Sequence, residues 1–242
     1  MVKHALHSLG YAEEAAEYNH IAYGVVSLSK DTAEALGVEV SDDKEVYAMS
    51  GRKGIGVKVT DLLDLLCKEI SQIQRKSGVD LTDPDLASSQ EIALAAIKHY
   101  MLKNNPYTPI LFDYKQALKL VGNTGPYLQY SHARACSILK KFEPFDTSCT
   151  KGAELASTEE ALLKDLESWP FIVGRVLEDF NLAILSEYAF TLAQSFHTFY
   201  EHNNVSQSEG SVKNFRLTLI LAFTKVMQEV LQVMGISAPK RM

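Results

Sequence analysis

A glycine-rich segment at residues 49–54 carries two adjacent cations. It reads M-S-G-R-K-G and lies between two short apolar runs, V-Y-A and V-K-V. Glycines allow backbone N–H groups to approach a phosphate chain closely, and cations neutralise the charge that develops during phosphoryl or nucleotidyl transfer. The residue types therefore suit phosphate chemistry. A solvated turn between two strands is the alternative interpretation.

A second segment, residues 122–134, places aromatic and basic side chains at helical spacing. It reads G-N-T-G-P-Y-L-Q-Y-S-H-A-R. Tyr127, Tyr130 and Arg134 stand at i, i+3 and i+7, so one helical face would carry all three. Such a face can stack on unpaired bases and hydrogen-bond to them. The alternative is that the tyrosines belong to a core and the arginine is a surface charge.

The charge of the chain is unevenly distributed. There are 24 Lys and Arg against 30 Asp and Glu, a net charge of −6, which argues against binding a polyanion over the whole surface. Residues 111–151 nevertheless carry six basic and three acidic side chains, a net charge of +3. This basic segment contains the aromatic and basic face, although a fluctuation of composition explains the charge as well. The final A-P-K-R-M is a further candidate for contact with a phosphate backbone, or a frayed end.

Several classes of protein are disfavoured by what the sequence lacks. The three cysteines are widely spaced and form no C-x-x-C pair, so a disulfide framework or a cysteine-based zinc site is not expected. No apolar run approaches the roughly 20 residues of a membrane helix. The common P-loop, nucleophile-elbow and zinc-protease motifs are absent from the sequence.

The elements that would position these residues change in kind along the chain. Short β-branched runs predict strands at 23–28, 46–50 and 57–59, with irregular structure at 31–40. Thr60 is the predicted cap of a following helix. So few strands cannot close a sheet, and the first sixty residues therefore predict an incomplete α/β region.

The remainder of the sequence predicts helices. One starts near Asp83–Asp85 and stops before Pro106, and a short extended piece follows at 109–112. Thr124 is the predicted cap of the helix that carries the aromatic face, and Ser157 with Glu160 has the spacing of a capping box. The predicted helices of the last part are 127–142, 159–184 with a break near Pro170, 187–203 and 211–234. They form a bundle.

Taken in order, the motifs resemble one family over essentially the whole chain. The segments M-S-G-R-K-G, L-L-D-L-L, F-D-Y, G-N-T-G-P-Y-L-Q-Y-S-H-A-R and A-P-K-R-M resemble the carboxy-terminal half of arginyl-tRNA synthetases. These class I enzymes activate arginine with ATP and Mg²⁺ and then esterify a tRNA, which must already be present for the activation. The resemblance implies a mostly α fold: a helical-bundle anticodon-binding domain preceded by a partial α/β (Rossmann-type) remnant of the catalytic domain.

The same resemblance implies three regions. Residues 1–60 would be the end of the class I catalytic nucleotide-binding domain, with its signature loop. Residues 61–121 would form a connecting helical region that contacts the tRNA stem. Residues 122–242 would form the anticodon-binding α-helical bundle.

The glycine-rich segment resembles the family's KMSKS loop, which stabilises the pyrophosphate leaving group. The catalytic residues implied are Met49, Ser50, Arg52 and Lys53. Ala48 and Gly51 stand where that motif has its two lysines, so either Arg52 or Lys53 would supply the charge. The tRNA-binding residues implied are Tyr127, Tyr130, Arg134, Tyr200 and Met242. No metal ligand is expected.

A HIGH-type motif, which the family carries in the first half of its catalytic domain, is absent from the 242 residues. We therefore expect a fragment of an arginine–tRNA ligase that is inactive alone and does not bind ATP or Mg²⁺ tightly. Arginine and ATP would bind through the other half of the catalytic domain, and the anticodon arm of tRNA through the bundle. The alternatives are a standalone tRNA-binding or regulatory module and a helical protein-interaction module. A cytoplasmic monomer that does not bind membranes is expected.

Overall fold

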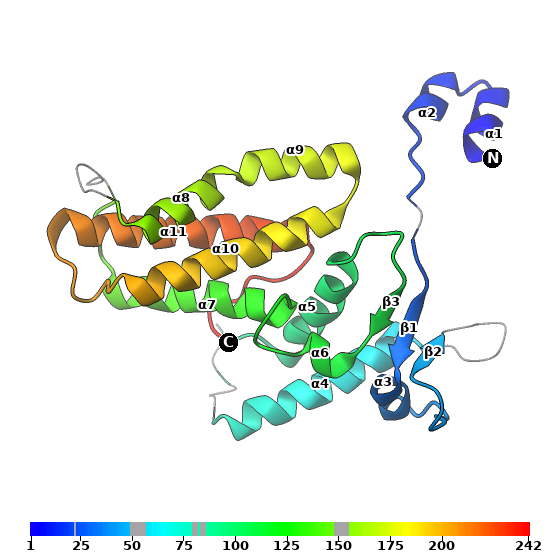
Figure 1. The fold of residues 1–242 in the computed structure, drawn as a ribbon, viewed down its shortest axis with the longest axis horizontal. Coiled ribbons are helices and arrows are strands. Elements are labelled where there is room, and N and C mark those ends of the chain that lie inside the picture. Colours follow the sequence, from blue (N-terminus) through cyan, green and yellow to red (C-terminus); the bar gives the residue numbers. More distant parts are fainter. Residues whose placement is uncertain (22, 49–56, 79–81, 83–85, 148–154) are drawn as a thin grey trace.

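Figure 1 shows a bundle of long helices beside a smaller α/β body, with two short helices set apart at the amino terminus. The structure is a computed structural model that describes residues 1–21, 23–48, 57–78, 82, 86–147 and 155–242. The predicted fold class, mostly α with a bundle after a partial α/β region, is confirmed.

Three strands form one mixed sheet in the α/β body. They are β1 (Val26–Ser29), β2 (Val46–Ala48) and β3 (Ile110–Phe112), in the order β2-β1-β3. Strand β1 runs antiparallel to β2 and parallel to β3, and Leu28 pairs with both Tyr47 and Phe112. All three side chains are buried, so the register places one apolar row in the core. Each strand overlaps a predicted extended segment.

Four helices surround the core of this body together with the sheet. They are α3 (Lys30–Ala35), α4 (Val59–Lys76), α5 (Ser89–Leu102) and α6 (Tyr114–Ala117). The core contains Leu28, Ala33, Tyr47, Leu62, Leu66, Ile70, Ala87, Ile92, Ala93, Ala96, Phe112 and Ala117. Residues on both sides of the boundary predicted at residue 60 therefore share one hydrophobic core.

Helix α3 corrects the prediction of irregular structure at 31–40. Ser29 caps it by accepting a hydrogen bond from the Thr32 backbone N–H at 3.3 Å. The Thr32 hydroxyl donates to the Phe112 carbonyl at 3.3 Å, which ties the helix to β3. A helix of six residues shows no repeated apolar period, and tertiary contacts of this kind stabilise it instead.

The predicted strand at 57–59 is wrong, as is the predicted cap at Thr60. Helix α4 already begins within this segment, and the extended residue before it, Lys58, makes no side-chain cap hydrogen bond. Leu62 and Leu66 lie four residues apart and are buried in the core. Burial of this apolar face, rather than a capping side chain, stabilises the helix.

Helix α5 contributes to the α/β core and to the bundle core at once. Its cap is Ser88, which accepts from the Glu91 N–H at 3.2 Å and whose own N–H donates to the Glu91 carboxylate at 2.8 Å. The predicted start at 83–85 lies outside the described residues. Ala93 is buried in the α/β core and Ala95 in the bundle core, so α5 joins the two.

The bundle contains α7 (Gly125–Phe142), α8 (Ser157–Glu167), α9 (Trp169–Asp179), α10 (Leu182–His202) and α11 (Gly210–Val233). Its core is built from large side chains such as Leu128, Leu192, Phe196, Phe199 and Phe223. The predicted break near Pro170 is confirmed, because α8 and α9 are separate helices. The cap of α8 is one residue earlier than predicted: the Ala156 N–H donates to the Glu159 carboxylate at 2.8 Å.

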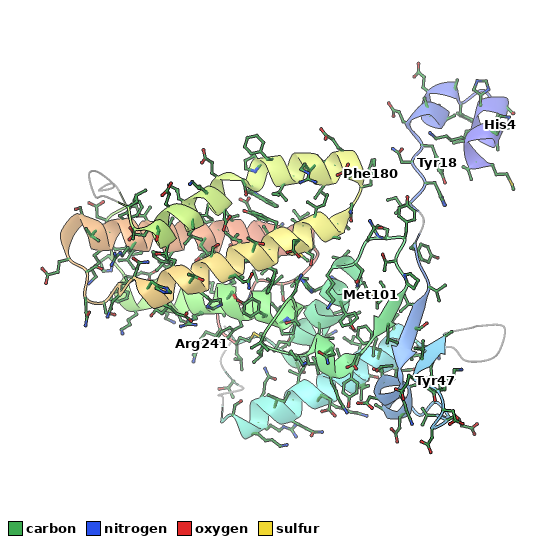
Figure 2. The ribbon with its side chains drawn as sticks, viewed as in Figure 1. His4, Tyr18, Tyr47, Met101, Phe180 and Arg241 are labelled. Carbon is green, nitrogen blue, oxygen red and sulfur yellow. The ribbon has the colours of Figure 1, made fainter. Side chains whose placement is uncertain are left out.

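The carboxy-terminal tail ties the bundle to the α/β body. It leaves α11 at Gly235, whose φ of +67° is a conformation that favours glycine. The Gln129 side chain of α7 donates to the Ser237 carbonyl at 3.0 Å, and His132 Nδ1 donates to the Pro239 carbonyl at 2.9 Å. Beyond these contacts, the Arg241 carbonyl accepts from the Ala87 N–H at 2.9 Å. Arg241 is labelled near the end of the chain in Figure 2.

The amino-terminal helices α1 (Val2–Ser8) and α2 (Ala12–Glu17) pack on each other, away from the rest of the chain. An extended segment leads from them to β1 (Figure 1). Among the described residues, no helix combines the length and the apolar character that crossing a membrane requires.

Candidate nucleic-acid interface

Local sequence signals fix the start of α7, the helix that carries the predicted face. The Thr124 hydroxyl accepts a hydrogen bond from the Tyr127 N–H at 3.3 Å, which confirms the predicted cap. Pro126 lies in the first turn, where a missing N–H costs nothing. Gly125 lies so close to α5 that a Cβ at this position would collide with the Ala95 carbonyl. The helix is therefore held at a fixed distance from α5.

The structure brings Tyr127, Tyr130, Arg134 and Tyr200 together where α7 and α10 meet. The Arg134 guanidinium carbon lies 5.0 Å from the centroid of the Tyr200 ring, within cation–π range. His197 lies among them: its ring centroid is 5.5 Å from that of Tyr127 and 6.2 Å from that of Tyr130. We call these five residues the α7–α10 cluster.

The two tyrosines of α7 differ in exposure. Tyr130 is 38% exposed, and its ring is stacked on that of His197 with an angle of 14° between the planes. Tyr127 packs against the bundle core and makes an edge contact with Phe190, and burial raises the pKa of its hydroxyl. Tyr127 is therefore a residue of the bundle core, whereas Tyr130 presents part of its ring to solvent.

Sequence reasoning did not single out His197. Arg134 Nη1 lies 3.2 Å from His197 Nδ1, and Ser131 Oγ lies 2.9 Å from His197 Nε2. The available signal was its position three residues before Tyr200, which places both on one face of α10. That signal becomes informative only when α10 is known to lie against α7.

Met242 does not join the α7–α10 cluster. It packs against the α/β core instead. The tail that leads to it contacts α7 through Gln129 and His132. Gln129 is two residues from Tyr127, and His132 is two residues from Arg134. Two residues correspond to about 200° around the helix axis. The tail and the cluster therefore lie on nearly opposite sides of α7.

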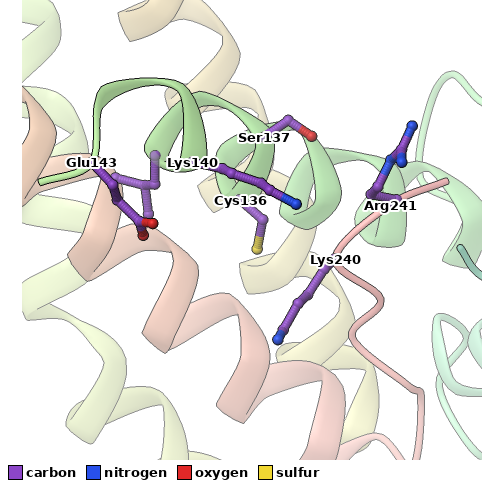
Figure 3. Close-up of a pocket in the computed structure, with 7 residues that line it drawn as sticks. Cys136, Ser137, Lys140, Glu143, Lys240 and Arg241 are labelled. Atoms are coloured by element: carbon purple, nitrogen blue, oxygen red, sulfur yellow. The ribbon is translucent and has the colours of Figure 1, made fainter. Parts of the chain in front are cut away.

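The tail and α7 enclose a basic pocket of about 520 Å³ (Figure 3). It is lined by Cys136, Ser137, Leu139, Lys140, Glu143, Lys240 and Arg241. Lys140 and Lys240 line it with one carboxylate, that of Glu143, so the pocket is suited to an anion. It contains two residues of the A-P-K-R-M ending.

The predicted catalytic residues Met49, Ser50, Arg52 and Lys53 lie outside the described residues. The elements on either side of them are described: β2 ends at Ala48 and α4 begins at Val59. Across the described ranges of the chain, no three His, Cys, Asp or Glu side chains gather closely enough to hold a metal ion.

Comparisons with known proteins show which proteins this chain resembles. A family described as "DALR anticodon binding domain" matches residues 128–242, which include the α7–α10 cluster from Tyr130 onwards. The arginine–tRNA ligase of Methanosphaerula palustris is 37% identical over 199 residues, covering 81% of this chain and 35% of its own length. That of Pyrococcus abyssi is 30% identical over 248 residues, covering 100% of this chain and 37% of its own length.

Solved structures agree with these relatives. Thermus thermophilus arginyl-tRNA synthetase matches with a TM-score of 0.79 and 28% identity, over 100% of this chain and 38% of that one. The Plasmodium falciparum arginyl-tRNA synthetase, at 22% identity and a TM-score of 0.64, shares the fold over 76% of this chain and 33% of its own.

The chain spans only 35% and 37% of the length of these two curated relatives. The match covers the anticodon-binding domain and the α/β elements before it. Over its whole length the chain is therefore similar to the carboxy-terminal part of arginyl-tRNA synthetases, and its residues 128–242 match the DALR anticodon-binding domain.

Proposed function

We propose that this chain is the tRNA-binding part of an arginine–tRNA ligase and that it binds the anticodon arm through the α7–α10 cluster. The observation that carries the proposal is the meeting of Tyr130, Arg134 and Tyr200 around His197, within the region that matches the anticodon-binding domain. Proteins recognise single-stranded RNA loops by stacking unpaired bases on aromatic faces and guanidinium groups, and this cluster brings both together.

The cluster provides both a stacking surface and an unneutralised charge. The exposed ring of Tyr130 can stack on an unpaired base. Among the ion pairs between described residues, none involves Arg134. Its charge is therefore available to a base edge or a phosphate, because its contacts are a neutral ring nitrogen and an aromatic face.

The basic pocket supports a second contact with the same RNA. Lys140 belongs to α7, six residues after Arg134 and therefore about 120° away around the helix, and Lys240 belongs to the tail that lines the same pocket. Cations that contact phosphates neutralise their charge and fix the register of the RNA without reading its sequence. We therefore assign backbone contact to the pocket and base contact to the cluster.

The ligase reaction itself belongs to the same proposal. We propose that Met49, Ser50, Arg52 and Lys53 form the loop that stabilises pyrophosphate when ATP activates arginine. The sequence has no HIGH-type motif, so we propose that the 242 residues alone do not form arginyl adenylate. Because no described residues form a metal-binding group, none is assigned to Mg²⁺. The protein would act in the cytoplasm, where tRNA is charged, as a monomer.

A binding assay with matched variants tests the proposed interface. Fluorescence anisotropy would measure the affinity of a transcribed arginine-accepting tRNA for the wild type, Tyr130→Ala and Arg134→Ala. Removing one stacking or guanidinium contact should weaken binding about tenfold. The matched control is Arg175→Ala, which removes an exposed cation of α9 and should change the affinity by less than about twofold.

Two results would contradict the proposal. The first is binding that is indifferent to both Tyr130→Ala and Arg134→Ala, because the assigned surface would then not contact the tRNA. The second is the absence of salt-sensitive binding by the wild type, since contact with phosphates requires it. That second result would favour the helical protein-interaction module instead.

A further inference from the structure

The hydrogen bonds around His197 fix which ring nitrogen carries its proton. Arginine has no acceptor atom, so Arg134 Nη1 donates to His197 Nδ1, 3.2 Å away. Nδ1 must therefore be unprotonated, and the proton of the neutral ring is on Nε2. Ser131 Oγ agrees with this tautomer: it donates to the Tyr127 carbonyl at 2.8 Å and so accepts from Nε2 at 2.9 Å.

This chain of hydrogen bonds runs in one direction across the helix contact. Arg134 donates to His197, His197 to Ser131, and Ser131 to the backbone of Tyr127. The ring is also held by the aromatic side chains on either side of it. Its position is therefore determined by α7 as well as by α10, and it can orient the guanidinium that bonds to it.

We propose that the neutral imidazole of His197 is a positioning residue for tRNA binding: by accepting at Nδ1 it holds the Arg134 guanidinium over Tyr200, oriented toward an RNA base. The inference rests on the proposed function, because it assigns a task to a residue beside the same interface. A ring nitrogen orients the guanidinium without neutralising it, whereas a carboxylate in this place would compete with the RNA for its charge.

Protonation of His197 would break its contact with Arg134. A protonated ring donates at both nitrogens, so its Nδ1–H would face the Arg134 donor and two cations would lie side by side. The charged and titratable groups around the ring are Arg134, Tyr127 and Tyr130 on α7 and Glu201 on α10. Burial and Arg134 lower the pKa of His197, and Glu201 opposes them. The positioning contact is therefore intact near neutral pH and is lost in acid.

Two substitutions separate the acceptor from the ring. His197→Phe keeps an aromatic ring beside Tyr130 but has no acceptor for Arg134. His197→Asn has a side-chain oxygen close to where Nδ1 lies, so it keeps an acceptor that does not titrate. His202→Asn is the matched control, because His202 is an exposed histidine of α10 whose Nδ1 donates to the Thr198 carbonyl within its own helix.

The experiment measures the affinity of a transcribed arginine-accepting tRNA at about pH 8 and about pH 5. At the higher pH, His197→Phe should bind about tenfold more weakly, the usual effect of losing one hydrogen bond to a charged group. His197→Asn should remain within about threefold of the wild type. On acidification, the wild type should lose affinity relative to His197→Asn, and His202→Asn should follow the wild type.

Three results would overturn the inference: unchanged affinity in His197→Phe, equal losses in the Phe and Asn variants, or parallel pH profiles of the wild type and His197→Asn. Circular dichroism checks that each variant folds. If the Phe variant does not, His197→Gln replaces it, since its amide reaches toward Ser131 rather than Arg134. Arg134→Ala and Tyr130→Ala distinguish failure of the proposed function from failure of this inference. If both variants leave tRNA binding intact, the proposed function fails; if they weaken binding and His197→Phe does not, only this inference fails.

Discussion

The guanidinium of Arg134 lies over the ring of Tyr200, 5.0 Å from its centroid, although the two residues belong to different helices of the bundle. The contact joins the sequence segment with the most specific motif to a helix whose own sequence is less distinctive. It also defines a surface on which an aromatic face supports a cation without neutralising it.

The ring of Tyr200, rather than its hydroxyl, should matter for tRNA binding. Tyr200→Leu removes the face beneath Arg134, and we expect the affinity for an arginine-accepting tRNA to fall about fivefold, as for a partly desolvated cation–π contact. Tyr200→Phe keeps the face and should bind within about twofold of the wild type. Equal losses in both variants would show that the hydroxyl is the important group.

The close approach of α7 to α5 predicts opposite effects of the same substitution at two glycines. Gly125→Ala places a methyl group against the Ala95 carbonyl, and we expect a loss of about 2 kcal/mol or more in the free energy of unfolding. Gly174→Ala, in the middle of α9 with open space around the added Cβ, should raise the free energy of unfolding by about 0.5–1 kcal/mol. Urea denaturation measures both. An unchanged free energy of unfolding in Gly125→Ala would show that the two helices can separate at no cost.

Adjacent glutamates of α8 should contribute very differently to stability. Glu159 is buried, and its carboxylate accepts from Arg216 Nε at 2.6 Å and from the Ala156 N–H at 2.8 Å. Glu159→Gln leaves the arginine largely buried without its anion, so we expect a loss of about 3–5 kcal/mol. Glu160 pairs with Lys164 in solvent, and Glu160→Gln should leave the denaturation midpoint almost unchanged. Similar midpoints for the two variants would contradict this.

His99 should make the protein less stable in acid. Burial between α5 and α10, where Nε2 lies 2.9 Å from Ser186 Oγ, lowers its pKa from 6.5 to about 4. The unfolded chain therefore binds a proton at a higher pH than the folded chain does. Neutral His99 therefore contributes to the free energy of unfolding in full above about pH 6.5. This contribution, roughly 3 kcal/mol in all, is lost as the pH falls to about 4.

The variant His99→Gln keeps a polar contact to Ser186 but does not titrate. Its free energy of unfolding, measured from about pH 7 to about pH 4, should fall less steeply than that of the wild type. His202→Gln, at an exposed position, should follow the wild type across the same range. A His99→Gln variant with the wild-type slope would contradict the assignment to His99.

The start of α7 could be predicted from sequence because its signals are local. The Thr124 cap, Pro126 in the first turn and the spacing of Tyr127, Tyr130 and Arg134 all lie within eleven residues. Helix α3 could not be predicted, since a six-residue helix depends on the bond from Thr32 to the distant Phe112 carbonyl rather than on periodicity.

The candidate site shows the same limit. His197 acquires its meaning from α10 lying against α7, a contact between residues 63 positions apart along the chain. Met242 ends a tail whose path is set by Gln129, His132 and Ala87, and it is this path that brings the residue to the α/β core. Spacing within one helix carries no information about either contact.

The central claim, that the α7–α10 cluster binds the anticodon arm, is tested most directly by dividing the tRNA. The affinity of the wild type would be measured for an isolated anticodon stem-loop and for an acceptor-stem minihelix of the same arginine-accepting tRNA. We predict that the stem-loop binds at least about tenfold more tightly than the minihelix. We also predict that Arg134→Ala removes this preference. A wild type that binds the minihelix as tightly as the stem-loop would contradict the account.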